Sequence, residues 1–174
     1  MITIVCSTNR KNSVSKTVSK IYNKILDGLD VESQILDLSD LPGDFTISAL
    51  YDKSGENEVF NQLALKMTRA KKFVFIVPEY SGSFPGVLKA FIDGLPFPNS
   101  FNNKKCALVG LSTGVQGGGL ALSHLTDIFN YCGMHVLALK PKLSNIDQYL
   151  SENIISNKLY MELLEEQAQH LIDF

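Results

Sequence analysis

Residues 78–83, Pro-Glu-Tyr-Ser-Gly-Ser, follow a run of β-branched and aromatic residues that is typical of a strand buried on both faces. Pro78 fixes the backbone angle φ and has no amide to donate, whereas Gly82 permits another group to approach the backbone closely. The amides from Glu79 to Ser83 are therefore free to face a planar polar ligand. An ordinary strand-to-helix loop, with Ser83 as the helix N-cap, accounts for the same residues about equally well.

Residues 7–15, Ser-Thr-Asn-Arg-Lys-Asn-Ser-Val-Ser, combine hydroxyls with two cations where a helix is predicted to begin. A helix amino terminus carries unpaired amides and partial positive charge, and hydroxyls with a guanidinium complete an anion site. A phosphate monoester is the expected ligand of this site. The alternative is simple capping by Asn12 or Ser13, with the cations solvated. Neither the Gly-x-Gly-x-x-Gly dinucleotide turn nor a Gly-Lys-Thr nucleotide loop is present at this turn.

A third loop, residues 112–119, reads Ser-Thr-Gly-Val-Gln-Gly-Gly-Gly after another apolar run. Its glycines permit backbone conformations and contacts that side chains would block. The loop is predicted to form a second wall of the ligand site. A flexible loop without a guest is the alternative, because a glycine-rich stretch alone is weak evidence.

These loops need a scaffold, and the hydrophobic periodicity predicts one in which strands alternate with helices. Such alternation indicates an α/β fold with a doubly wound parallel sheet in the order 2-1-3-4-5, formed by a single domain over residues 1–174. All three loops then emerge at one edge of the sheet, with the first and third strands adjacent. The strands are expected at residues 2–6, 31–38, 73–77, 106–111 and 136–139.

Residues 39–55 show no sustained period but contain several apolar side chains, so we expect this loop to cover the ligand or a partner subunit. A loop that closes a small satellite core is the alternative. The apolar segments 45–51 and 95–101 also predict a homo-oligomer, because contiguous apolar patches mark interfaces or binding grooves.

The composition limits the classes of partner that the protein is expected to bind. A net charge of −2 gives no electrostatic footprint for nucleic acid or an acidic membrane surface, so a small molecule is the expected partner. The first apolar run is too short for a signal peptide or a membrane span, which predicts a cytoplasmic protein. The three cysteines are widely spaced among apolar residues and predict reduced thiols. Neither they nor the histidines have metal-ligand spacing, and no metal site is assigned.

The order of these motifs resembles the NADPH-dependent FMN reductase family, which is flavodoxin-like in fold and includes quinone, azo-dye and chromate reductases. The resemblance covers roughly residues 1–133. It rests on Ser7-x-x-Arg10-x-x-Ser13, on the stretch Pro78 to Lys89, and on the glycine-rich turn. Two departures are visible. Ser81 stands where the family usually has Asn, and Ile92-Asp93-Gly94-Leu95-Pro96 replaces a pattern with an aromatic after Asp.

The resemblance implies a role for each loop. The first would hold the FMN phosphate, through Ser7, Arg10, Ser13 and Ser15. The second would line the isoalloxazine ring, through Pro78, Glu79, Tyr80, Ser81 and Gly82, and the third would close its other side, through Ser112, Thr113 and Gly114. Tyr80 is also a candidate hydrogen-bond donor near the ring.

The implied activity is oxidoreduction, with hydride passing from NADPH or NADH to FMN and on to a small-molecule electron acceptor such as free flavin or a quinone. No protein nucleophile or general acid is required, so no catalytic residue is assigned. The resemblance also implies a homodimer or homotetramer. An FMN-binding electron carrier or a regulatory flavoprotein remains the alternative, although such carriers tend to be more acidic than this chain.

Overall fold

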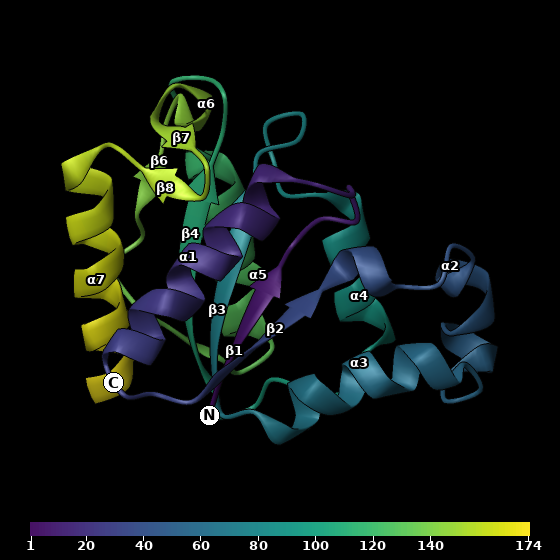
Figure 1. Cartoon of the computed structure of the whole chain (residues 1–174). Coiled ribbons are helices and arrows are strands. Elements are labelled where there is room, and N and C mark those ends of the chain that lie inside the picture. The colour runs from purple at the N-terminus through teal and green to yellow at the C-terminus, as the bar shows by residue number, and fades with distance from the viewer.

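A twisted parallel sheet forms the centre of the protein, whose computed structural model describes all residues from 1 to 174. Figure 1 shows the sheet crossed by helices on both faces. Its strand order, β2-β1-β3-β4-β5, confirms the predicted doubly wound fold. The three inner strands are nearly continuous runs of buried residues, as expected when both faces are covered. The strands are β1 (Ile2–Cys6), β2 (Ser33–Asp37), β3 (Lys72–Pro78), β4 (Lys105–Leu111) and β5 (His135–Val136).

Two separate hydrophobic cores lie on the two faces of the sheet. On one face α1 (Val14–Gly28) and α7 (Lys158–Asp173) pack together over residues such as Val74 and Val109. On the other, α3 (Glu58–Arg69), α4 (Gly86–Gly94) and α5 (Gly119–Tyr131) cover a core rich in aromatic rings. Side chains alternate between the faces along each strand, so both layers hold β3 and β4 firmly and fix where their following loops begin.

The fifth strand position is divided. The sequence predicts one strand at residues 136–139, but β5 ends at Val136 and β6 (Lys142–Leu143) resumes pairing with β4. The chain between them leaves the ladder, and the buried Gln167 amide compensates by donating to Leu108 O at 2.9 Å and Leu139 O at 2.8 Å. A polar side chain from α7 thus keeps a buried carbonyl of β4 paired.

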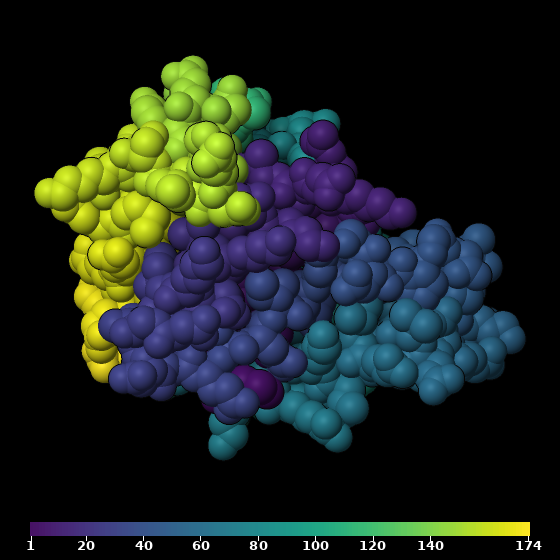
Figure 2. Space-filling model, in the orientation of Figure 1, coloured from purple at the N-terminus to yellow at the C-terminus, as the bar shows by residue number.

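Residues 39–55 form short helical turns, η1 (Leu38–Asp40), α2 (Phe45–Ser48) and η2 (Tyr51–Lys53), which bulge from the side of the molecule (Figure 2). Phe45 stacks on Phe60 of α3, with ring centroids 5.9 Å apart, and Leu50 is buried beside them. No residue of this loop lines the cavity described below, so its role as a cover of a ligand or a partner subunit stays a prediction. The satellite core explains its buried side chains, while Ile47 and Tyr51 remain exposed.

After β6 the chain makes a compact excursion before α7. It consists of α6 (Ile146–Tyr149) and a two-stranded hairpin, β7 (Leu150–Ser151) with β8 (Ile154–Ile155). Figure 1 places this excursion at the same end of the sheet as the loops that follow β1, β3 and β4. No helix combines the length and the apolar character that a membrane span requires.

Candidate functional site

The three predicted loops meet at the carboxyl edge of the sheet around a cavity of about 250 Å³. In a doubly wound sheet this edge, where the strand order reverses, is where ligands bind. Eight of the predicted site residues line the cavity, together with four that sequence reasoning missed. The lining residues are Arg10, Asn12, Ser13, Val14, Ser15, Pro78, Glu79, Tyr80, Leu111, Ser112, Thr113 and Ile146.

The first loop brings unsatisfied polar groups to the amino terminus of α1. The Ser15 hydroxyl is buried, with only 1% of the residue exposed, and has no hydrogen-bond partner. A buried hydroxyl without a hydrogen-bond partner destabilises the folded protein unless a ligand or a water molecule forms that bond. Arg10 also lines the cavity and forms no ion pair. Ser13 is the N-cap, and its hydroxyl accepts from the Lys16 amide at 3.2 Å.

A neighbouring cation is held away from this loop. Lys16 Nζ lies 2.8 Å from the Asp37 carboxylate at the end of β2. Burial alone would raise the pKa of Asp37, but hydrogen bonds from Lys16 and from the Ser39 amide outweigh it, and the pKa lies below its usual value. Lys16 is therefore engaged structurally, and Arg10 is the cationic side chain that borders the cavity.

The second loop is a tight turn of defined type. Tyr80 and Ser83 exchange backbone hydrogen bonds of 2.8 and 3.0 Å, and the two residues between them have φ angles of 51° at Ser81 and 72° at Gly82. Two positive φ angles indicate a type I′ turn, for which Asn-Gly is the preferred pair. Ser81 is exposed at the tip, and neither it nor Gly82 lines the cavity, in contrast to the prediction.

Side chains tie this turn to the other two loops. Tyr80 Oη lies 2.8 Å from Thr8 Oγ1, and either hydroxyl can be the donor of this hydrogen bond, so the predicted role of Tyr80 as a donor near the ring stays a prediction. The Glu79 carboxylate accepts a hydrogen bond from the Gly118 amide at 3.0 Å, at the amino terminus of α5. The three loops therefore form a connected rim rather than independent segments.

The third loop is internally braced. The Ser112 hydroxyl donates to Gly114 O at 2.9 Å and accepts from the Gly117 amide at 3.0 Å, so its donor is not free. Thr113 lines the cavity and is exposed, whereas Gly114 does not line it.

Ser7 is the remaining predicted residue outside the cavity lining. It is fully buried, and its hydroxyl donates to Val5 O at 3.2 Å, which makes it part of the strand end.

Of the residues that were missed, Asn12 and Val14 are sequence neighbours of predicted ones, and Leu111 is the last residue of β4. Ile146 is different, because it comes from α6 and reaches the cavity only through the folding of the carboxyl-terminal segment. No local pattern around Ile146 distinguishes it from a core residue, so only the tertiary structure could identify it.

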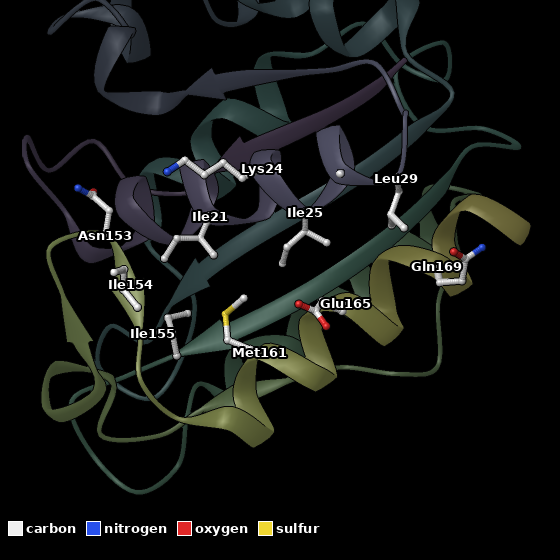
Figure 3. A pocket seen from close by; sticks show the side chains of 11 residues that line it. Ile21, Lys24, Ile25, Leu29, Asn153, Ile154, Ile155, Met161, Glu165 and Gln169 are labelled. Carbon is white, nitrogen blue, oxygen red and sulfur yellow. The ribbon is translucent and has the colours of Figure 1, made fainter.

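The largest hollow of the molecule lies elsewhere. Figure 3 shows this groove of about 680 Å³ between α1 and α7, beside the β7–β8 hairpin. Apolar side chains such as Ile25 and Met161 form much of its lining, and Glu165 stands on its wall. None of the residues predicted to do chemistry lies there, and cavity size alone does not make it the reactive site.

Comparison with known proteins identifies the family. Residues 1–145 match the sequence model of the NADPH-dependent FMN reductases. The chain belongs to this family. The resemblance inferred from the motifs is thereby confirmed, and with it an oxidoreductase that depends on FMN and NAD(P)H.

Relatives and solved structures agree with this assignment. A 2-hydroxy-1,4-benzoquinone reductase from a Burkholderia species is 28% identical over 145 residues, which span 82% of this chain and 76% of the relative. An NAD(P)H-dependent FMN reductase from Schizosaccharomyces pombe is 34% identical over 79 residues, only 45% of this chain and 38% of that protein. The flavoenzyme FerB from Paracoccus denitrificans, an NAD(P)H:(acceptor) oxidoreductase, superposes with a TM-score of 0.77 over 99% of this chain and 94% of its own, at 24% identity.

The cavity fits the cofactor of the family. FMN combines a phosphate with a planar ring, and the cavity offers an orphan hydroxyl and an unpaired guanidinium at one helix terminus. The lining also includes apolar side chains such as Val14, Leu111 and Ile146, which suit the planar ring.

Proposed function

We propose that this chain is a single FMN-binding domain over residues 1–174 whose cofactor occupies the cavity at the carboxyl edge of the sheet. One observation carries this proposal: the Ser15 hydroxyl, which has no hydrogen-bond partner, and Arg10 line the same cavity at the start of α1. Arg10, Ser13 and Ser15 hold the phosphate, with help from the amides of the first turn of α1. Asn12 completes the anion site.

The ring lies against the second and third loops in this proposal. Pro78, Glu79 and Tyr80 border it from one side, and Ser112 and Thr113 from the other. Ser7, Ser81, Gly82 and Gly114 support the loops from outside the cavity. Bound FMN supplies the hydride chemistry, and the protein places the cofactor, keeps one face accessible and provides amide donors.

The proposed reaction carries hydride from NADPH or NADH to a quinone or a similar acceptor. The quinone reductase among the relatives supports this acceptor class. Because the donor leaves before the acceptor enters, steady-state kinetics with NADPH and a benzoquinone should give parallel double-reciprocal lines. Intersecting lines, or no quinone-dependent oxidation of either nicotinamide, would count against it.

We further propose a homo-oligomer that works in the cytoplasm. Ile47, Tyr51 and Phe97 are 79%, 81% and 67% exposed, and they lie in the two apolar segments, 45–51 and 95–101, from which an interface is predicted. The three cysteines are free, as suits a reducing compartment. Light scattering should report a dimer or tetramer, and Phe97→Asp should lower the measured mass. A monomer at micromolar concentrations would contradict the assembly.

A further inference from the structure

The segment Ser144–Ile146 runs alongside the glycine-rich loop and binds three of its carbonyl groups. The Ile146 amide donates to Ser112 O at 3.1 Å, the Asn145 amide to Gly114 O at 3.0 Å, and the Ser144 hydroxyl to Val115 O at 2.9 Å. We call this segment the bracket. The family match ends within it, at residue 145.

The bracket is itself held by α7. Tyr160 Oη donates to the Ser144 carbonyl at 2.9 Å, and the Tyr160 ring packs edge-on against Tyr149, with centroids 5.7 Å apart. Asn145 within the bracket has a φ of 47°, a left-handed conformation that Asn adopts more readily than most residues. The contact with the loop is also close, because a Cβ on Gly117 would lie 2.8 Å from Ser144 Oγ.

These contacts determine where the amides of the loop point. In a trans peptide the carbonyl and the next residue's amide point in opposite directions. With the carbonyls of Ser112, Gly114 and Val115 turned toward the bracket, the amides of Thr113, Val115 and Gln116 turn away from it. None of these three amides has an acceptor within the chain. They are donors held in a fixed direction, and of the three residues only Thr113 lines the cavity.

We propose that Tyr160 is a positioning residue for the cofactor: through the bracket it holds the free Thr113 amide in place to donate to the polar edge of the flavin. This inference rests on the proposed FMN site. Tyr160 lies beyond the family match, which ends at residue 145. Two contributions to flavin affinity can then be measured separately. The first loop recognises the phosphate, whereas the bracket acts on the ring.

The test compares Tyr160→Phe with Tyr149→Phe. Both changes delete one phenolic oxygen and keep the packed rings, but the Tyr149 hydroxyl forms no hydrogen bond within the chain. Tyr160→Phe should weaken FMN and riboflavin by the same factor, roughly three- to tenfold, as expected for one hydrogen bond. Tyr149→Phe should leave both affinities unchanged, and Ser144→Ala should behave like Tyr160→Phe.

The midpoint potential of bound FMN supplies a second measurement that mere structural support would not move. Amide donors favour the reduced cofactor, which carries more negative charge, so Tyr160→Phe should make the potential more negative. Affinities and potential equal to those of Tyr149→Phe would overturn the inference while leaving the FMN site intact. Loss of FMN affinity alone, with riboflavin unaffected, would also overturn it. If the unmodified protein bound neither flavin, the proposed FMN site would fail and this inference with it.

Discussion

The hydroxyl groups of Thr8 and Tyr80 lie 2.8 Å apart and join two loops that are 72 residues apart in the chain. Thr8 is fully buried at the end of β1, and its oxygen also accepts the Arg10 amide at 3.3 Å. The contact therefore connects the loop proposed for the phosphate to the turn proposed for the ring. Tyr80 therefore links the two loops, whichever of the two hydroxyls donates.

This link should be measurable as an energetic coupling. Thr8→Val and Tyr80→Phe each remove one hydroxyl with little change in shape, and together they should cost less than the sum of the single changes. We expect a coupling of about 1 kcal/mol in the free energy of unfolding, as for one buried hydrogen bond. Urea denaturation of the four proteins measures it, and strictly additive effects would show that the contact contributes nothing.

The phosphate assignment predicts different effects of two adjacent cations. Arg10 lines the cavity, whereas its neighbour Lys11 is exposed and does not. Arg10→Ala should weaken FMN by roughly 10- to 100-fold, in line with loss of a charged hydrogen bond, and should barely affect riboflavin. Lys11→Ala is the matched control and should leave both affinities nearly unchanged. Fluorescence titration with the two flavins decides between these outcomes. Equal affinities of the unmodified protein for both would remove the phosphate from the account.

The turn after Tyr80 predicts a stabilising substitution. Ser81 has a φ of 51°, where Asn is better tolerated than Ser, and Asn-Gly is the preferred pair for a type I′ turn. Ser81→Asn should raise the free energy of unfolding by about 0.5 kcal/mol. Because the residue lies outside the cavity lining, FMN affinity should stay the same.

Gly82→Ala is the opposing control for that turn. Its φ is 72°, and an added Cβ would meet no other atom within 4 Å, so any loss of stability comes from the backbone alone. A loss of about 1 kcal/mol is expected. Thermal denaturation of both variants measures the pair, and a destabilised Ser81→Asn protein would contradict the assigned turn geometry.

Asp37 predicts a pH dependence of stability. Its pKa is lower in the folded protein than in the unfolded chain, so its contribution is present above the unfolded value of about 3.9 and is lost as pH falls through the folded value. Asp37→Asn should destabilise the protein by about 1 kcal/mol at neutral pH. The difference between the two proteins should shrink steadily below about pH 4. A constant difference down to acidic pH would show that the Lys16 pair is not responsible.

The fold could be predicted from the sequence because its signals are local. Apolar runs such as residues 73–77 and 106–111 predict buried strands. The parallel topology then brings the loops that follow them to one edge of the sheet. The same reasoning predicts Arg10, Ser15 and Thr113 at one edge of the sheet, and all three line the cavity there. The family motif added the identity of the cofactor.

Other features depend on contacts that no local pattern encodes. The hydroxyl partners of Tyr80 and Ser112 follow from loop conformation, and Ile146 enters the site only because the chain after β6 folds back over the third loop. The split of the fifth strand likewise depends on Gln167, a single residue of α7 that is distant in sequence. Periodicity cannot reveal such pairings, because each requires the tertiary structure to exist first.

The proposed function depends on reduction of protein-bound FMN by a nicotinamide. The most direct measurement is anaerobic mixing of the FMN-loaded protein with NADPH, and separately with NADH, while the visible absorbance of the flavin is followed. Rapid bleaching by at least one nucleotide is expected, with recovery of the colour when a benzoquinone is added. Flavin that neither nucleotide bleaches within minutes, although dithionite bleaches it at once, would contradict hydride transfer and favour an electron carrier.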